Sequence, residues 1–569
     1  MSNRAAWIVG AALVWLALLA LGPSLFNRPF HTTGEAREAA VVRTMFEGGS
    51  KVLPRVDGHR IPSKPPLYHW LALGLGSLRG GVDEISARLP SLVLASAAVG
   101  LVAHAGVALS GPVGGALAGL LLLTSVEFIH QARVARVDAT LSFFLTCCLV
   151  AALQSCSLGP SRGRRAAFAI GTLGATLAKG PVGLILPLLL VALAGLLDGR
   201  MAGTAPERGG RFRAARRALL SVGAIDAVLL TLVVAGAWYF SAWTIGGEDF
   251  ASQHFLKENL LRVFAPERLG TGHRHGPLYL LPKFLLGALP FSLLLPALAW
   301  HLARSRPLDV STRFLLVWCL GILVVFSLSA SKRAAYLLPA YPALALLLAN
   351  LLVARDPDRV THRLATAALA LLGSIVVAVA AIVLLASFDI QFDGRLKELL
   401  SAKDRQGLDV LLHNVQAARP GLVVPGSGAA GFGFFALYLI RRGRLAQAAG
   451  SLAAALLFVL AGILPPFEQA LAASRSHAPF ARAAMARVGE RQCGLVGEED
   501  HALAFYYMAR PLRRFKSMAE AEEAALEFLI TDATTGLPAA SSWTLLLKSA
   551  SSGESGNKPL ALLQRKALP

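Results

Sequence analysis

The chain has 569 residues, enough for three or four soluble domains of about 150 residues each. Its composition excludes that arrangement, because 55% of the residues are hydrophobic and only 16% are charged, whereas soluble domains carry about 25% charged residues. The net charge is +21, but the Lys and Arg residues lie mostly between apolar blocks. This distribution is typical of contact with a membrane and its anionic lipids, and it argues against a nucleic-acid partner.

The apolar blocks predict membrane-spanning helices, because about 20 apolar residues cross the hydrocarbon core. The first run, 6–26, has no small-x-small cleavage site at its end, which favours a retained helix over a signal peptide. Segment 67–80 is short and carries Arg79, so we expect an interfacial helix there. The fold class expected is an all-α polytopic membrane bundle of about 13 transmembrane helices, with the other twelve runs near 89–109, 113–130, 139–157, 166–178, 181–197, 218–243, 284–300, 314–330, 337–353, 364–387, 421–440 and 445–464.

The charges of the loops predict the orientation. One set of short loops holds 18 Lys and Arg residues in 55 positions, whereas the opposite set holds 23 in 151. The positive-inside rule places the denser set in the cytoplasm, and this set consists of 158–165, 198–217, 301–313, 354–363 and 441–444. We therefore expect a multi-pass protein of the cytoplasmic membrane, with loop 27–87, loop 244–283 and the C-terminus on the outer side.

The last hundred residues differ from the apolar bundle. Segments CGLVG, FLIT and TLLLKS read as short strands, and SMAEAEEAALEFL reads as an amphipathic helix with Ser517 as its N-cap. Residues 549–558 read as a flexible loop. The expected organisation is a transmembrane domain over 1–466 and a small extracytoplasmic α/β domain over 467–569. The five cysteines form no disulfide framework.

The first outer loop carries an unusual set of polar residues. A helical pattern begins near Thr33, which can cap it, and carries Glu35, Arg37, Glu38 and Arg43. Further on, Lys64 lies between prolines that stiffen the backbone and aim its ammonium group. The alternative is a charged interfacial helix followed by a proline turn without catalytic meaning.

A second candidate is Asp138, at the start of an apolar helix on the same expected side as Glu35. It is either an N-cap, favoured by the helix dipole, or a carboxylate aimed into a cavity at the membrane surface. Glu127 and His130 lie one helical turn apart nearby, and they are either metal ligands or a satisfied polar pair.

Cations gather at three further places on the expected outer side. Lys179 ends one helix, and Lys332, Arg333 and Tyr336 form a basic turn. Lys and Arg there either bind a phosphate or extend to lipid headgroups. Loop 244–283 adds Arg262, His273 and His275 among aromatic residues, a composition suited to carbohydrate or headgroup contact. No Walker, GxSxG or HExxH motif is present.

Taken in order, these motifs resemble the GT-C superfamily of membrane glycosyltransferases. The chain looks most similar to the bacterial branch that contains the lipid A aminoarabinose transferases, and more distantly to protein O-mannosyltransferases. The motifs that carry the resemblance are GEAR (34–37), GSKVLP (49–54), KPPLYHW (64–70), ARLPS (87–91), Asp138, the Lys-Gly-Pro turn at 179–181, and Ser331, Lys332, Tyr336 and Pro339.

The resemblance implies transfer of a sugar from a polyprenyl phosphate carrier to an envelope glycolipid, glycan or protein acceptor at the outer membrane face. It implies that Asp138 and Glu35 are the candidates for the catalytic carboxylate that activates or orients the acceptor hydroxyl as general base, and that the carrier phosphate is bound by Lys64, Arg262, Lys332, Arg333 and Tyr336. The same cavity would include Arg37, His69, Lys179, His273 and His275. Alternatives are a transporter or lipid flippase, and a ligase that joins finished glycans.

Two positions depart from the family pattern. Gly34 stands where the aminoarabinose branch has the first Asp of its Asp-Glu pair, and Ser63 stands where that branch has Glu before Lys-Pro-Pro. A carboxylate is therefore missing at each place, so we expect neither aminoarabinose as the sugar nor a tightly bound divalent metal, and no cofactor is assigned.

Overall fold

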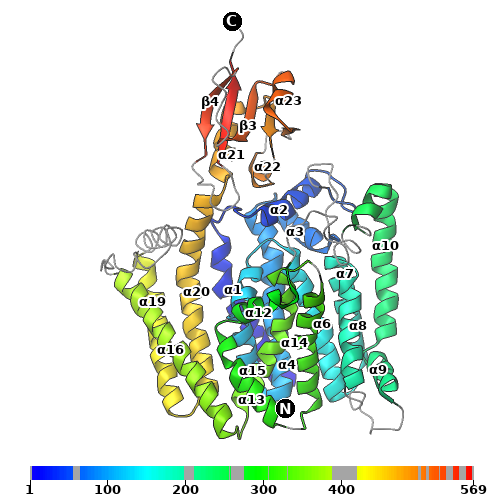
Figure 1. Cartoon of the computed structure of the whole chain (residues 1–569), viewed down its shortest axis with the longest axis vertical. Helices are drawn as coiled ribbons and strands as arrows, with labels where there is room; N and C mark the ends of the chain where they lie inside the picture. The colour runs from blue at the N-terminus through cyan, green and yellow to red at the C-terminus, as the bar shows by residue number, and fades with distance from the viewer. Residues whose placement is uncertain are drawn as a thin grey trace.

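The computed structural model describes residues 3–55, 64–197, 210–254, 257, 275–305, 307–329, 331–387, 419–497, 501–507, 512–524, 526–533, 542–549 and 559–566. It is a bundle of long helices with a small sheet at one end, next to the C-terminus (Figure 1). Apolar segments form helices here because the helix satisfies every backbone hydrogen bond internally, as a lipid environment requires.

The N-terminal half supplies the centre of the bundle. Its helices are α1 (Asn3–Leu21), α2 (Thr33–Phe46), α3 (Leu67–Arg79), α4 (Glu84–Leu123), α5 (Val126–Ala132), α6 (Val137–Leu158), α7 (Arg162–Lys179), α8 (Val182–Leu197), α9 (Gly210–Ser221) and α10 (Ala224–Ala251), with a 3₁₀ turn η1 at Gly22–Leu25.

The second half begins with two short helices and continues with long ones. These are η4 (Pro277–Tyr279), α12 (Leu280–Gly287), η5 (Phe291–Leu294), α13 (Leu295–Arg304), α14 (Val310–Leu328), η6 (Ala334–Ala340), α15 (Tyr341–Val353), α16 (Arg359–Ser387), α19 (Arg419–Arg441) and α20 (Leu445–Arg475).

Among the described residues, nine helices are long and apolar enough to cross a membrane, so the expected number of thirteen is not confirmed. Part of the difference lies in α4, whose 40 residues contain two expected spans. At Gly111 the φ angle is +77°, and the chain turns there. A Cβ on Gly106 would lie 2.8 Å from the Cα of Gly115, so the second half of α4 packs back against the first.

Other expected spans are interrupted by local chemistry. The run 113–130 ends at Leu123, where the hydroxyls of Thr124 and Ser125 donate to carbonyls of the last turn. The run 284–300 is divided between α12 and α13, which are bent by 105°. The run 218–243 is divided at Gly223, whose φ is +78°. Helix α7 is not among the nine apolar helices because its first turn contains three arginines. Helix α8 is apolar but has only 16 residues, so it is not among them either.

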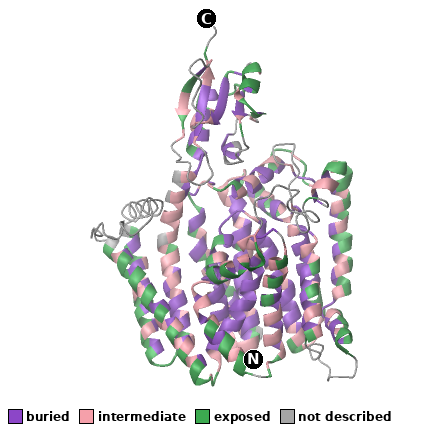
Figure 2. Ribbon diagram, viewed as in Figure 1, coloured by how far each residue is buried: buried purple, intermediate pink, exposed green. Residues whose placement is uncertain are grey.

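The exposed surface of the outer helices matches a membrane environment. On α10, the side chains of Leu232, Val233 and Phe240 are more than 60% exposed, and Figure 2 shows exposed residues along α16 and α19 as well. Such apolar belts would be a liability in water. The central helices α4, α6 and α15 are mostly buried. The chain is therefore built as a multi-pass membrane protein.

The C-terminal sheet has five strands in the order β2-β1-β3-β5-β4. Strand β1 pairs in parallel with β2 and β3, whereas β5 runs antiparallel to β3 and β4. Helices α21 (Ala478–Val488), α22 (His501–Tyr506) and α23 (Met518–Glu523) accompany the strands. The strands are β1 (Cys493–Val496), β2 (Arg513–Phe515), β3 (Phe528–Asp532), β4 (Trp543–Lys548) and β5 (Leu560–Arg565).

Three expected strands are present, but the expected C-terminal end of one helix was wrong. The helix capped by Ser517 ends at Glu523, because FLIT belongs to buried strand β3. Helix α20 runs through residue 466 without a break, so the chain continues as helix across the expected division between 466 and 467.

The sheet end of the molecule contacts the first outer loop. The amide of Phe30 donates to the hydroxyl of Tyr506 at 2.7 Å, and that hydroxyl donates to Glu84 at the start of α4 at 2.7 Å. The residues that follow α1, the start of α4 and the C-terminal sheet unit therefore meet at one end of the bundle (Figure 1).

Candidate active site

Asp138 lies at the centre of a cluster of opposite charges. It is the second residue of α6 and is 4% exposed. Its Oδ1 accepts a hydrogen bond from Lys179 Nζ at 2.5 Å, and its Oδ2 lies 3.3 Å from Arg136 Nε. The alternative that Asp138 is the N-cap of this helix is therefore wrong. Arg136 holds the N-cap position, and both carboxylate oxygens of Asp138 contact cations.

Lys179 connects this carboxylate to a third segment of the chain. It is the last residue of α7, where the helix dipole favours a cation. Its ammonium nitrogen lies 4.4 Å from the ring centroid of Tyr336, on η6. Asp138, Lys179 and Tyr336 thus come together from α6, α7 and η6, although they are far apart in the sequence.

Arg136 also occupies the space beside Gly34. A Cβ built on Gly34 would lie 2.3 Å from an Nη atom of Arg136. The guanidinium group therefore fills the place that a side chain at position 34 would use. The glycine that departs from the family pattern and the arginine beside Asp138 are neighbours.

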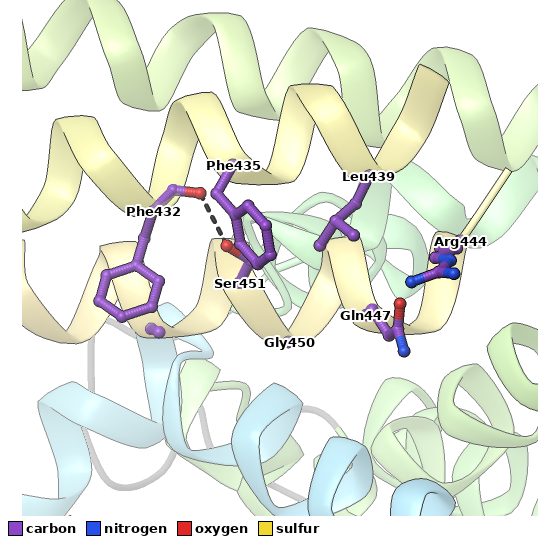
Figure 3. A pocket seen from close by; sticks show the side chains of 8 residues that line it. Phe432, Phe435, Leu439, Arg444, Gln447, Gly450 and Ser451 are labelled. Atoms are coloured by element: carbon purple, nitrogen blue, oxygen red, sulfur yellow. Dashed lines mark hydrogen bonds between the residues drawn. The ribbon is translucent and has the colours of Figure 1, made fainter. Parts of the chain in front are cut away.

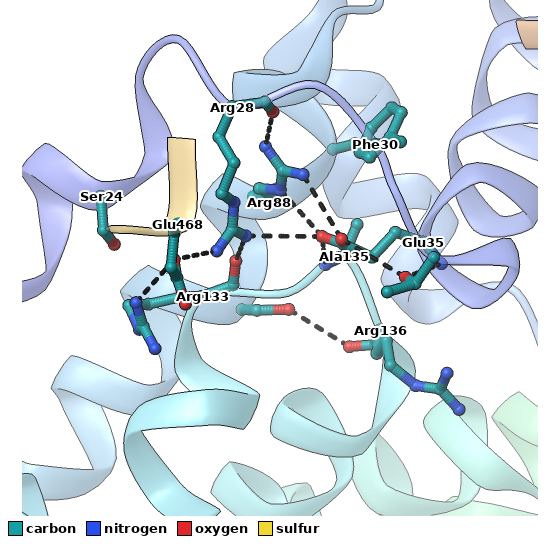
Figure 4. A network of polar contacts seen from close by, with 12 residues as sticks. Ser24, Arg28, Phe30, Glu35, Arg88, Arg133, Ala135, Arg136 and Glu468 are labelled. Atoms are coloured by element: carbon teal, nitrogen blue, oxygen red, sulfur yellow. Dashed lines mark hydrogen bonds and ion pairs between the residues drawn. The ribbon is translucent and has the colours of Figure 1, made fainter. Parts of the chain in front are cut away.

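Glu35 lies in a buried ionic network next to this cluster (Figure 4). Its Oε1 accepts from Arg88 Nε at 2.8 Å and from the amide of Ala135 at 3.1 Å, and Arg28 lies 3.6 Å away. Burial raises the pKa of Glu35, but Arg88 and Arg28 outweigh it and lower the pKa to about 2. The residue is therefore an ionised carboxylate whose oxygens are already engaged.

The same network reaches the last long helix. Glu468 on α20 pairs with Arg28 and, at 2.8 Å, with Arg133 (Figure 4). Arg88 donates to the carbonyl of Arg28, and Arg28 donates to the carbonyl of Arg133. These contacts fix segment 133–138, which carries Arg136 and Asp138, against α2, α4 and α20.

A second buried group lies in the first loop. Helix α2 is capped by Thr32, one residue before the expected Thr33. On this helix Glu38 accepts from Arg37 at 2.7 Å and pairs with His69 of α3 at 2.9 Å. Burial raises the pKa of Glu38, yet Arg37 and His69 hold it well below its usual range. His69 is fully buried and joins α3 to α2.

The basic turn before η6 forms a further group. Lys332 is 4% exposed and donates to the carbonyls of His275 at 2.9 Å and Ser329 at 2.5 Å. The His275 ring stacks on Tyr279 with 3.7 Å between centroids. Arg333 follows Lys332 directly and is half-buried.

Lys64 is half-buried and stands three residues before Leu67. Leu67 packs in a cluster with Leu177, close to the end of α7 that carries Lys179. Arg262 and His273 lie outside the described residues, so their predicted roles stay predictions.

Sequence reasoning did not assign Arg28, Arg88, Arg133, Arg136 or Glu468 to the site. Four of them are buried or nearly so, and a charge in or next to an apolar run is a signal of function or of pairing inside a membrane bundle. Arg88 belongs to the ARLPS motif and Arg136 directly precedes the helix with Asp138, so both could have been chosen from their neighbourhood.

In the described part of the chain, no three His, Cys, Asp or Glu side chains are grouped to hold a metal ion. Glu127 instead accepts a hydrogen bond from Gln131 at 2.8 Å on the same helix.

Comparisons with known proteins find relatives over part of the sequence. The chain is 30% identical over 362 residues to an undecaprenyl phosphate-α-4-amino-4-deoxy-L-arabinose arabinosyl transferase of Pseudomonas aeruginosa, covering 62% of this chain and 61% of that protein. An uncharacterised protein of Aquifex aeolicus is 27% identical over 334 residues, which is 58% of this chain and 60% of that protein. The chain thus matches about three fifths of the length of these curated relatives, and no family model matches it.

Among solved structures, the crystal structure of ArnT from Cupriavidus metallidurans bound to undecaprenyl phosphate aligns with a TM-score of 0.73 and 23% identity, covering 97% of both chains. The apo form of that protein aligns with a TM-score of 0.71 and 22% identity, over 99% of this chain and 98% of that one. The whole architecture, including the small sheet, is therefore shared. This chain is therefore similar, over about three fifths of its sequence, to an aminoarabinose transferase, and it shares the fold of ArnT.

Proposed function

We propose that this protein is a glycosyltransferase that moves a sugar from a polyprenyl phosphate carrier to an acceptor hydroxyl at the outer face of the cytoplasmic membrane. The observation that carries the proposal is the buried Asp138 between Lys179 and Arg136, with Tyr336 under the ammonium group. The relatives named above transfer a sugar from such a carrier, and their fold favours this function over a transporter or flippase.

The proposed step exchanges one C–O bond for another. The acceptor oxygen forms a bond to the anomeric carbon, while the bond from that carbon to the carrier phosphate breaks. The phosphate leaves with the electron pair, and the acceptor proton passes to the Asp138 carboxylate as general base. Fixed cations then stabilise the charge that grows on the leaving phosphate.

Lys179 and Arg136 are placed for the leaving group because both already face the same carboxylate. Two cations against one buried carboxylate leave an excess of positive charge, which favours a phosphate beside them. Lys332, Arg333 and Lys64 extend this positive field from the neighbouring turns. Tyr336 adds a hydroxyl and an aromatic face for the sugar or the phosphate.

Glu35 has a different role in this proposal. Arg88, Arg28 and the Ala135 amide take up its oxygens, so it positions the segment that carries Asp138. Asp138 then acts alone as the base. This division follows from the contacts of the two carboxylates, since only Asp138 is paired with cations of the proposed phosphate site.

Gly34 and Arg136 affect which charge the transferred sugar can carry. Arg136 puts a cation where the aminoarabinose branch has an acid, and like charges repel in a site of low dielectric constant. A sugar with an ammonium group is therefore disfavoured, and we propose a neutral or acidic sugar for this protein.

The test is mass spectrometry of polyprenyl phosphates and envelope glycolipids from a strain that lacks this protein. The proposal predicts that a sugar-linked polyprenyl phosphate accumulates, that one glycoconjugate loses a sugar, and that the wild-type gene reverses both changes. The Asp138→Asn gene should reverse neither at equal expression. An unchanged pool of sugar-linked carriers in the deletion strain would contradict the proposal.

A further inference from the structure

A cavity of about 560 Å³ opens at the end of the bundle opposite the sheet. It lies between the bend of α4, the last turn of α15, the first turns of α16, and the turn from α19 to α20. The lining residues come from three separate parts of the chain, namely 110–113, 351–365 and 443–447. The cavity is distant from the candidate active site, because α15 and α16 cross the bundle between the two ends (Figure 1).

The polar lining of this cavity includes two arginines beside the neutral side chains of Ser110, Thr361 and Gln447. Arg355, His362 and Arg444 line it, and no carboxylate does. Asp356 and Asp358 lie in the same turn as Arg355 but do not line the cavity, and Asp358 accepts hydrogen bonds from the amides of Val360 and Thr361, the hydroxyl of Thr361 and the indole of Trp300. In the part of the chain that the structure describes, neither Arg355 nor Arg444 forms an ion pair. The cavity therefore holds two guanidinium groups that have no directly paired carboxylate among the described residues.

A second cavity, of about 420 Å³, adjoins the first and shares Arg444 and Gln447 with it. Figure 3 shows Phe432, Phe435 and Leu439 along this groove, between α19 and α20. The hydroxyl of Ser451 donates to the carbonyl of Phe432 at 2.7 Å, so this wall has no unused hydroxyl proton. A cationic head pocket thus continues into a groove with aromatic and aliphatic walls.

We propose that the two cavities together bind one anionic phospholipid of the cytoplasmic leaflet. Its phosphate lies against Arg355 and Arg444, and one acyl chain follows the groove past Phe432 and Phe435. The combination decides the occupant, because a soluble phosphate would use the cations and leave the groove empty, whereas a neutral lipid would use the groove and leave the cations unpaired. Basic pockets between membrane helices on the cytoplasmic side suit anionic headgroups. The leaflet follows from the proposed orientation, whereas the site does not depend on the transferase reaction.

The test uses the full-length protein in detergent and measures lipid binding by native mass spectrometry. The probes are phosphatidylglycerol and phosphatidylcholine with the same acyl chains, with glycerol 3-phosphate as a soluble competitor. The proposal predicts tighter binding of phosphatidylglycerol. The variant Arg355→Ala with Arg444→Ala should lose this preference, with binding weaker by roughly fivefold for each arginine, the usual contribution of one cation beside an anionic lipid surface.

The matched control removes two arginines from the same end of the bundle without touching the cavity. Arg363→Ala with Arg441→Ala serves this purpose, because neither side chain lines the cavities. This control should keep the preference for phosphatidylglycerol.

A third variant tests the groove. A Cβ at Gly450 would meet Leu117 at an ordinary 3.7 Å, so Gly450→Leu can enter the groove. It should weaken binding of both lipids while leaving the binding of glycerol 3-phosphate unchanged. Phe435→Ala provides a second groove variant if the first is unstable.

Three results would overturn the proposal. These are equal binding of the two lipids, an equal loss in the control pair, or displacement of phosphatidylglycerol by glycerol 3-phosphate at the same concentration. None of these readouts uses sugar transfer, so a failure here is separate from a failure of the proposed function.

Discussion

At the scale of single residues, the two acids of the site differ in what surrounds them. Glu35 is enclosed by Arg88, Arg28 and a backbone amide, whereas Asp138 faces Lys179 and Arg136 beside Tyr336. The sequence showed two carboxylates on one side of the membrane, but it did not show which cation each would meet. Arg136 and Arg28 lie close to these acids in the sequence, but Lys179 is 41 residues from Asp138 and Arg88 is 53 residues from Glu35, and such distances leave no local pattern.

Glu35→Gln should destabilise the protein by about 3–5 kcal/mol at pH 7, because it removes the carboxylate paired with buried Arg88 and leaves Arg28 with Glu468 alone. Thermal unfolding in detergent measures this loss. Since the pKa of Glu35 is lowered from 4.5 to about 2, its stabilising effect is complete above about pH 4.5 and disappears as the pH falls toward 2.

Wild-type protein and the Gln variant should therefore converge in stability as the pH falls through this window. Arg79→Ala, which breaks an exposed pair with Asp83 in the same loop, is the control and should change stability by less than about 1 kcal/mol. A Gln variant as stable as the wild type at pH 7 would remove the structural role assigned to Glu35.

At the scale of elements, the hydrophobic pattern was a good guide to the existence of helices and a poor guide to their ends. The pattern indicated apolar runs on both sides of Gly111, and the structure places them in two packed segments of α4. It did not indicate that Thr124 and Ser125 would end the second run, because their effect depends on hydroxyl bonds to the preceding turn. Strand β2 was missed because it has only three residues and depends on pairing with β1. Strand β5 has six residues and was also missed; it pairs with β3 and β4.

Gly111→Ala should lower the stability by about 1–2 kcal/mol, because φ is +77° there and an L side chain is strained in that conformation. Gly236→Ala is the matched control, since that glycine lies inside α10 and a methyl group added to it would meet no atom within 4 Å. It should be neutral or stabilising by up to about 1 kcal/mol. Thermal unfolding in detergent measures the stability change of each variant. Equal changes would show that the turn does not require a glycine at position 111.

At the scale of the whole molecule, the distribution of Lys and Arg among the loops agrees with the two ends of the helix bundle. The loops rich in Lys and Arg join helices at the end of the bundle away from the sheet, and the candidate site lies toward the sheet end (Figure 1). The division of loops into two sets could be made from the sequence because it needs only the order of spans and the position of charges. The buried network from Arg28 to Glu468 could not, because it joins residues 440 positions apart.

The orientation itself can be measured with reporter fusions to the full chain. Alkaline phosphatase, which is active only outside the cytoplasm, should be active when fused after Pro569. A fluorescent protein that matures in the cytoplasm should fluoresce when inserted at Gly443, between α19 and α20. The reverse pattern would place the candidate site on the cytoplasmic side and contradict the proposed topology.

The most direct test of the proposed active site measures sugar transfer and carrier binding in the same purified Asp138→Asn variant. This change removes the base and leaves every cation in place. We predict that transfer falls by at least about a hundredfold, the lower range for a general base, while affinity for the polyprenyl phosphate stays within about threefold of wild type. Transfer at the wild-type rate would contradict the account, as would loss of carrier binding in place of transfer.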